Sequence, residues 1–343
     1  RKPTIDEFKS LIKEKDFEIE EGFIVLFEEF IEFKKIDFKK SPSSLKDYIS
    51  FKNSILDFSK FKDKKLSIFS FDLQQLREYF LFLQDKRPIG KSFLTIGGLD
   101  GKTIKKRLDA LRIFLCWLRD FKKYPVQSEI ENYQNFRAGL KLKLDKITKD
   151  PKKISLTATQ VQSIINYPLE KLTSPEKKVR DMFLFILFTG IRISDLLKIN
   201  EDKIKDYNGI KYLSGKSVKT NKPFEVELSD IAYEIIERNN FNMNLMTAQK
   251  GNEYLKKFLS KIDLFQIETN YYKSSDVDNQ VRYKLYEIMT FHQGRRTFIT
   301  NMLDKGYSAV EVMRRTDHTK ISTLEKYVSP KGYSQKNKLN LYE

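Results

Sequence analysis

The sequence predicts a mainly α-helical protein of two domains, the second an α+β domain with a small antiparallel sheet. A length of 343 residues exceeds what one ordinary hydrophobic core organises, and 40% apolar residues suffice for two cores. Apolar residues recur at helical spacing over most of the chain, whereas alternating patterns occur only in short segments after residue 210. A charged stretch near residue 150 without an apolar period separates the halves.

Residues 1–142 are expected to form the first, helical domain. Ser43 and Ser44 stand where N-caps belong, ahead of apolar residues at helical spacing. The segment SFLTIGGLDG contains three Gly and predicts a loop. The expected helices are Glu20–Phe33, Ser44–Phe58, Leu73–Leu83, Lys102–Phe121 and Ile130–Leu140.

Residues 143–155 lie in the charged segment and are expected to be a linker. The second domain then covers 156–330, and residues 331–343 form a polar tail. Its expected helices are Leu156–Asn166, Pro175–Thr189, Arg192–Ile199, Asp230–Arg238, Ala248–Ile262, Phe291–Lys305, Ser308–Arg315 and Ser322–Tyr327. Its expected strands are Lys211–Leu213, Pro223–Leu228 and further short strands within 266–290.

The charge balance is strongly basic. Lys and Arg total 64 against 47 Asp and Glu, which gives a net charge of +17. Such an excess favours a polyanionic partner, namely DNA, RNA or an anionic membrane surface. The alternative is a Lys-rich solvated surface without a specific partner.

Arginine is scarce beside lysine, yet two Arg pairs lie close together, Arg295 with Arg296 and Arg314 with Arg315. Guanidinium offers a flat bidentate fork for phosphate and stays charged. The pairs therefore indicate sites where phosphate is bound.

Several classes of function are disfavoured. The single cysteine, Cys116, allows no disulfide within the chain, which favours a reducing, cytoplasmic compartment. No apolar run reaches the roughly 18 residues of a membrane span, and the first residues are not a signal peptide. Zinc-type Cys/His spacing, a Walker loop and a dinucleotide fingerprint are all missing. We therefore expect no metal, no cofactor and no membrane partner.

The two histidines, His292 and His318, each stand in a segment that also contains Arg. His292, Arg295 and Arg296 are spaced i, i+3 and i+4, so they share one helix face. Three such groups repel one another unless an anion is present. The spacing predicts a phosphate site, with an exposed basic helix face as the alternative.

Four separated motifs resemble the tyrosine-recombinase (phage-type integrase) family of mobile elements. FHQGRRTFIT and RRTDHTKISTLEKY resemble its H-x-x-R motif, downstream His and Tyr, with intervals of 3 (292 to 295), 23 (295 to 318) and 9 (318 to 327). FTGIRISDLLKI resembles the family's first Arg motif and supplies Arg192, and VKTNKPFEVEL resembles its hairpin and supplies Lys219. The resemblance covers residues 156–330. The first half resembles the family's core-binding domain only in helical pattern and size.

The resemblance implies a DNA strand transferase without metal or ATP. Tyr327 would attack a phosphodiester to give a 3′-phosphotyrosine and a free 5′-hydroxyl, and the phosphotyrosine bond conserves the energy for rejoining. Arg192 and Arg295 would clamp the non-bridging oxygens, and Lys219 would protonate the leaving oxygen. His292 would be the acid–base partner of Tyr327, and His318 would donate to a phosphate oxygen.

Three positions near these motifs need separate comment. Asp195 is either an orienting partner for Arg192 or a local helix residue. Arg296 stands where the family often has His, and it is expected to contact phosphate or pair with Asp317. Asp317 replaces the Gly that commonly precedes the family's second His, and an acid there carries an electrostatic cost unless it points away from the phosphate.

The first domain offers a second basic surface. Lys102, Lys105, Lys106 and Arg112 lie on one expected helix whose opposite face is apolar, so this helix either contacts DNA or is an ordinary solvated face. The resemblance implies a two-domain DNA clamp, with a homotetramer of one dimer per recombination site and an optional DNA-bending accessory protein. Residues 1–18 are too short for the family's additional arm-binding domain, which we expect to be either absent from this protein or removed from this chain. The tail 331–343 is a candidate for docking on a neighbouring protomer.

Two other functions remain as alternatives. A type IB topoisomerase uses the same chemistry without a synapse, and a DNA-binding regulator would not cleave at all. Because phosphate contacts carry no base information, the sequence does not specify the DNA site or the recombination product.

Overall fold

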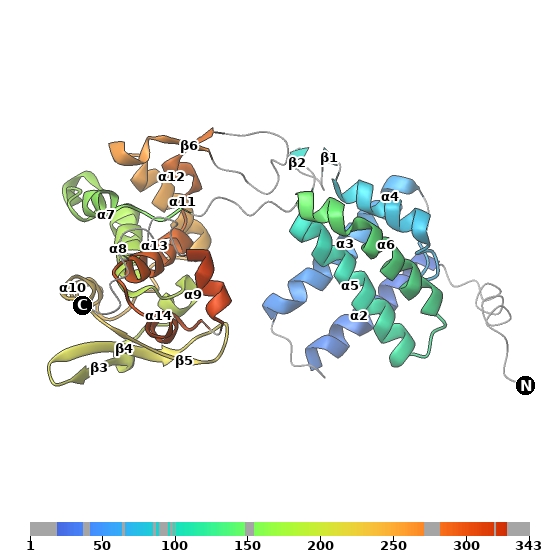
Figure 1. Cartoon of the computed structure of the whole chain (residues 1–343), viewed down its shortest axis with the longest axis horizontal. Coiled ribbons are helices and arrows are strands. Elements are labelled where there is room, and N and C mark those ends of the chain that lie inside the picture. Colours follow the sequence, from blue (N-terminus) through green and yellow to red (C-terminus); the bar gives the residue numbers. More distant parts are fainter. Residues whose placement is uncertain are drawn as a thin grey trace, which may run out of the picture. The chain divides into compact units, whose positions relative to one another are not determined.

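The computed structural model describes residues 19–36, 42–63, 66–84, 87–88, 95–96, 99, 101–147, 154–270, 282–318 and 320–327. The chain divides into two compact units, the first ending at Pro151 and the second beginning at Lys152 (Figure 1). In the described ranges no helix is long and apolar enough to cross a membrane.

The first unit is a helical bundle with an aromatic core. Phe27, Phe30 and Phe114 are fully buried, and the rings of Phe27 and Phe114 are 4.7 Å apart. These residues recur at helical spacing, so helices bury one apolar face each. The unit contains α2 (Ile19–Ile36), α3 (Pro42–Lys62), α4 (Leu73–Gln84), β1 (Arg87–Pro88), β2 (Thr95–Ile96), α5 (Gly101–Asp120) and α6 (Gln127–Ile147). β1 and β2 pair antiparallel, and β2 lies within the segment SFLTIGGLDG, which is expected to be a loop.

The expected linker of residues 143–155 is partly wrong, because α6 continues to Ile147. Leu and Lys alternate in its last turns, and both residue types have high helix propensity. The same composition is therefore compatible with a helix and with a solvated linker. Residues 148–153 lie outside the described part of the chain, and Ile154 and Ser155 are non-helical.

The second unit surrounds α8 with other helices and places a small sheet at one side (Figure 1). Its helices are α7 (Ala158–Ile165), α8 (Ser174–Thr189), α9 (Ile193–Leu196), α10 (Asp230–Arg238), α11 (Ala248–Leu259), α12 (Leu285–Ile288), α13 (Phe291–Asp304), α14 (Ala309–Thr316) and α15 (Ile321–Leu324). Its strands are β3 (Ile204–Tyr207), β4 (Ile210–Lys216), β5 (Pro223–Glu227), β6 (Glu268–Asn270) and β7 (Arg282–Lys284). Short 3₁₀ turns are η1 (Leu169–Lys171), η2 (Glu201–Lys203), η3 (Asp263–Phe265) and η4 (Glu325–Tyr327).

The sheet of the second unit has the antiparallel order β3–β4–β5. Leu213 on β4 pairs with Val226 on β5, and both are buried. The alternation in β5 buries Phe224 and Val226 and exposes Glu225 between them, as the pattern FEVEL predicts. The sequence does not indicate β3, because its residues alternate only weakly and are mostly exposed.

From Met182 to Leu187 helix α8 is apolar and buried on all sides, because α10, α11 and α13 pack around it. It ends at Gly190, whose φ of +67° lies in the left-handed region. A Cβ at Gly190 would also collide with the ring of Phe298. Glycine therefore lets the chain turn sharply at the end of the core helix, two residues before Arg192.

Two further expectations need correction. The expected helix Arg192–Ile199 shrinks to the single turn α9, Ile193–Leu196, with Arg192 as its N-cap residue. Within 266–290 the structure has the strands β6 and β7, but Leu285–Ile288 is the helix α12, whose N3 residue Glu287 accepts from the backbone N–H of Lys284 at 2.8 Å.

Candidate active site

The guanidinium of Arg192 lies between α9, the β4–β5 turn and the end of α14. Its Nη1 donates to Asp317 Oδ2 at 2.6 Å and to Ser217 Oγ at 3.2 Å. The side chain keeps 20% of its surface exposed. Arg192 is therefore held on one side by protein and open on the other.

Arg295 projects from α13 and is more deeply buried, at 4% exposure. Its Nη1 donates to the Gly190 carbonyl at 2.7 Å, and its Nη2 donates to the Thr316 carbonyl. These bonds tie the end of α8 to the end of α14. Burial and the positive charge of Arg192 lower the pKa of Arg295 to about 10, so it still carries its charge at neutral pH.

His292 stands one turn before Arg295 on α13 and is exposed. Desolvation by the surrounding protein, then the positive charges of Arg296 and Arg295, lower its pKa to about 4. Smaller contributions to the lower pKa of His292 come from the positive charges of Arg192 and Lys219. The imidazole is therefore neutral at neutral pH, the state in which it can accept a proton.

His318 and Tyr327 lie against each other. Their ring centroids are 5.9 Å apart in an edge-to-face arrangement, and the pKa of His318 is lowered to about 4 by burial and then by Arg295. The Thr316 hydroxyl donates to the Val312 carbonyl and contacts His318 Nδ1 at 2.7 Å. Because this hydroxyl has one hydrogen, Nδ1 is the protonated nitrogen and Nε2 is the acceptor in the neutral ring.

Tyr327 is anchored within its own unit. Its carbonyl accepts from Thr300 Oγ1 at 3.4 Å, and its half-buried ring packs against the cluster of Ile299, Met302, Val312 and Leu324. The guanidinium of Arg296 lies over the same ring, with Cζ 5.8 Å from the ring centroid. Arg296 thus contacts Tyr327, whereas Asp317 pairs with Arg192, and the expected pairing of Arg296 with Asp317 is not formed.

Asp195 ties the β4–β5 turn to α9. It is 5% exposed, and its Oδ1 accepts from the Val218 backbone N–H at 2.8 Å. Ser217 Oγ is 3.5 Å from its Oδ2, and Arg192 Nη1 is 4.0 Å away. The shortest of these contacts holds the turn, and an orienting role of Asp195 for Arg192 stays a prediction. That turn exposes the side chain of Lys219.

The six expected catalytic positions all belong to the second unit. The sequence missed three polar residues that connect them, namely Ser217, Thr220 and Thr316. Ser and Thr in turns carry no distinctive pattern, so no sequence signal identifies them. Among the described residues no cluster of His, Cys, Asp or Glu could hold a metal ion.

In the first unit, α5 carries Lys102, Lys105, Lys106 and Arg112 with exposed side chains. Lys106 forms an ion pair with Asp47 at 3.2 Å. This pair is solvent-exposed and so contributes little to stability. The helix buries its opposite face, including Leu108, Leu111 and Leu115.

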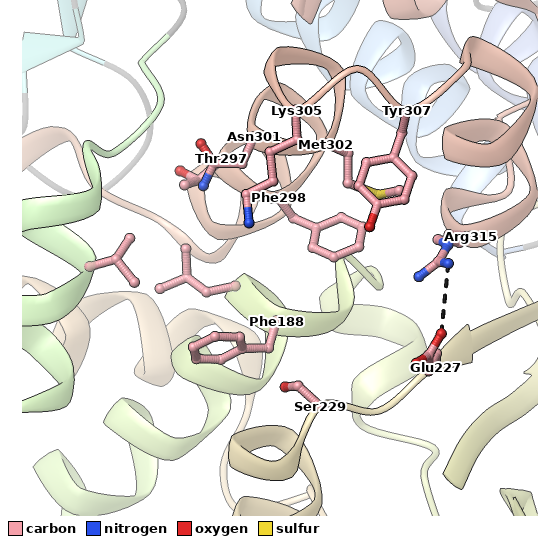
Figure 2. A pocket seen from close by; sticks show the side chains of 12 residues that line it. Phe188, Glu227, Ser229, Thr297, Phe298, Asn301, Met302, Lys305, Tyr307 and Arg315 are labelled. Atoms are coloured by element: carbon pink, nitrogen blue, oxygen red, sulfur yellow. Dashed lines mark ion pairs between the residues drawn. The ribbon is translucent and has the colours of Figure 1, made fainter. Parts of the chain in front are cut away.

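A pocket of about 370 Å³ lies elsewhere on the second unit (Figure 2). Its walls include Val161, Phe188 and Phe298, with a polar rim where Arg315 faces Glu227 at 3.8 Å. Met302 lines it as well and also belongs to the cluster that Tyr327 packs against.

Fold and site together define a tyrosine recombinase: two arginines, two histidines and a tyrosine held by one mainly helical unit with a small sheet. Residues 155–332 match the model of the phage integrase family, and the chain belongs to this family.

Its similarity to individual proteins is more distant. The chain is 24% identical over 307 residues to the TnP I resolvase of Bacillus thuringiensis, covering 87% of this chain and 91% of that protein. The Tn1549 transposon integrase in complex with circular intermediate DNA has a TM-score of 0.60 at 16% identity, covering 89% of this chain and 94% of that one. The λ integrase tetramer bound to a Holliday junction has a TM-score of 0.55 at 12% identity, covering 90% and 78%.

Proposed function

We propose that this tyrosine recombinase cleaves and rejoins duplex DNA at specific sites through Tyr327. The observation that carries the proposal is the contact of the Tyr327 ring with His318 and Arg296, in the unit that also holds Arg192 and Arg295. A nucleophile beside a cluster of cationic side chains suits attack on a phosphodiester, because negative charge develops on the non-bridging oxygens.

The Tyr327 oxygen bonds to phosphorus as the bond to the 5′-oxygen breaks, and the phenolic proton passes to neutral His292 directly or through one water. Lys219 gives a proton to the departing 5′-oxygen. Arg192 and Arg295 hold the non-bridging oxygens. The negative charge of the bound phosphate raises the pKa of His318, which takes up a proton from solvent and donates to one of these oxygens. The reverse reaction rejoins the strand.

We propose duplex DNA with two recombination sites as the substrate and a tetramer, one dimer per site, as the active assembly. The λ integrase structure, described as a tetramer on a Holliday junction, supports this by fold similarity alone. The net charge of +17 supports a polyanionic partner. On this proposal the two units bind the duplex as a clamp, and α5 contacts the DNA backbone. A DNA-bending protein assists the reaction. The enzyme works in the bacterial cytoplasm beside the nucleoid.

We also propose that the tail 331–343 of one protomer occupies the pocket of Figure 2 on its neighbour. The tail carries Leu339, Leu341 and Tyr342 in an otherwise polar segment. The pocket offers apolar walls for these side chains, including Phe188 and Phe298.

The deciding experiment incubates the protein with a nicked suicide duplex that carries its recombination site, found by selection or beside its gene. A covalent protein–DNA adduct is expected, and Tyr327→Phe should abolish it while leaving DNA binding intact. Tyr307→Phe serves as the matched control, because Tyr307 is a partly exposed tyrosine of the same unit. An adduct that survives Tyr327→Phe would rule out this nucleophile. Relaxation of a plasmid without two-site recombination would indicate a topoisomerase.

A further inference from the structure

Asp317 occupies a strained position at the centre of the site. It caps the end of α14 with a φ of +53° and a ψ of 37°, and its backbone N–H donates to the Met313 carbonyl. Non-glycine residues are uncommon in this left-handed region, although Asp and Asn tolerate it best. Glycine would fit this turn with less strain, so the backbone does not explain the choice of Asp.

The carboxylate connects three segments. Asp317 Oδ2 accepts from Arg192 Nη1 at 2.6 Å and from Thr220 Oγ1 at 2.5 Å. Arg192 begins α9, Thr220 follows Lys219 in the β4–β5 turn, and Asp317 precedes His318. One buried oxygen therefore links the chain segments of three proposed catalytic side chains.

The burial of the Asp317–Arg192 pair favours a contact that persists during the reaction. The alternative is a carboxylate that occupies the place of the phosphate and must leave before DNA binds. The Asp317 side chain is 3% exposed, whereas Arg192 keeps 20%. Solvent therefore reaches part of the Arg192 side chain, whereas Asp317 is closed to it. Among the described residues no group accepts a hydrogen bond from Arg192 Nε or Nη2, so that side of the guanidinium stays available for bidentate contact.

Given the proposed function, we propose that Asp317 is a positioning residue that acts through Arg192 and the β4–β5 turn. It engages Nη1, so the Nε–Nη2 edge of Arg192 faces the scissile phosphate. Through Thr220 it also holds the turn that presents Lys219 to the leaving oxygen.

The charge state of Asp317 agrees with this role. Burial acts to raise its pKa, but hydrogen bonds from Thr220, Ser217 and Arg192 lower the pKa below its ordinary value. The group is therefore an anion at neutral pH. Its second oxygen, Oδ1, is buried without a hydrogen-bond donor among the described residues. The cost of burying this oxygen is therefore not offset, whereas an ion pair that served only stability would have both carboxylate oxygens hydrogen-bonded.

The first test is the variant Asp317→Asn, which keeps the shape and tolerates the left-handed backbone but loses the charge. Adduct formation on the suicide duplex is measured in a single turnover at saturating protein. A positioning role predicts a rate lower by about 10- to 100-fold, with DNA affinity nearly unchanged. An unchanged rate would refute the role. A faster rate would show that Asp317 instead competes with phosphate.

Asp181→Asn is the matched control. Asp181 is 13% exposed in the same unit and pairs with Arg238, whose Nε lies 2.9 Å away, but it has no contact with the proposed site residues. Its variant should cleave at the wild-type rate. Melting temperatures of both variants show whether any loss of rate comes from unfolding.

The second test asks whether Asp317 acts through Arg192. Asp317→Asn is combined with Arg192→Ala, and the slow adduct formation is followed over long incubations. If Asp317 acts through Arg192, the change Asp317→Asn should slow the reaction far less in the Arg192→Ala background than in the wild type, and any loss that remains there is carried by the β4–β5 turn. Equal losses in both backgrounds would exclude action through Arg192. A wild-type protein without any adduct would instead refute the proposed function.

Discussion

The guanidinium of Arg296 lies over the ring of Tyr327, with Cζ 5.8 Å from the ring centroid. A cation on the face of an aromatic ring is attracted by the ring quadrupole, by about 0.5 to 2 kcal/mol. Arg296 follows Arg295 on α13. The same helix therefore carries Arg295, which is proposed to bind phosphate, and contacts the proposed nucleophile Tyr327 through Arg296.

This contact predicts a specific loss in variants of Arg296. Arg296→Ala should slow adduct formation about tenfold, because the ring loses the cation that fixes it. Arg296→Lys, which keeps a charge without the flat group, should give a smaller loss. Arg315→Ala is the control, since Arg315 lies over Tyr307 at 5.7 Å in a comparable pair. Equal rates for Arg296→Ala and the wild type would contradict the prediction.

Lys219 provides a chemical test of the leaving-group role. Lys219→Ala should lower the cleavage rate of normal DNA by about 10² to 10⁴, because the 5′-oxygen then leaves without a proton. A duplex with sulfur in place of that bridging oxygen has a better leaving group and should restore the rate. Lys216→Ala and Lys222→Ala test its neighbours in the hairpin. Loss of rate that sulfur does not restore would assign the proton to another group.

The two histidines predict a pH dependence of stability. In the folded protein the pKa of each is about 4, against an ordinary value of 6.5. The unfolded chain therefore binds protons first as the pH falls. Their contribution to the free energy of unfolding is complete above pH 6.5 and is lost as the pH falls towards 4. The chain has only these two His.

Unfolding by guanidinium chloride at pH 7.0 and pH 5.5 measures this effect. The wild type should lose stability between these values, and the double variant His292→Asn with His318→Asn should lose much less. DNA brings negative charge to both rings and should raise their pKa, so binding at pH 5.5 should take up protons. An identical pH dependence in both proteins would contradict the assigned pKa shifts.

The basic residues of α5 predict salt-dependent binding. Lys102, Lys105, Lys106 and Arg112 share one exposed face of this helix. Replacing Lys105 or Arg112 by Ala should weaken binding to all DNA sequences and reduce the slope of log K against log salt by about 0.9 per lost phosphate contact. Lys60→Ala, an exposed lysine of α3, is the control. An unchanged slope would indicate a merely solvated face.

The pocket of Figure 2 predicts separate effects on cleavage and on synapsis. Phe188→Glu places a charge in its apolar wall, and a tail variant replaces Leu339 and Leu341 by Ser. Both proteins should still form the adduct on a single site but should lose recombination between two sites. Lys336→Ser is the control in the tail. If the tail variant recombines two sites as well as the wild type, docking of the tail is refuted. If the variants also lose cleavage of a single site, at every protein concentration, the result favours docking of the tail within its own chain.

The sequence predicted most helices because apolar spacing is a local property. Asp230–Arg238 has the same bounds in the structure, and the α8 helix differs by one residue at its start. Boundaries failed where charge and helix propensity conflict, as in residues 143–147 of α6. Strand β3 was not predicted because its residues are mostly exposed and do not alternate between apolar and polar.

The sequence by itself determined which side chains stand on one face, since His292, Arg295 and Arg296 are spaced within one helix. Only the tertiary structure decided the partners of the charged groups. Arg192 and Asp317 are 125 residues apart, and Arg295 reaches the Gly190 carbonyl across 105. Helical periodicity fixes neighbours over three or four residues, whereas these contacts depend on how α8, α13 and α14 pack. For that reason the sequence located Asp317 beside the site but did not reveal that Arg192, not Arg296, is its partner.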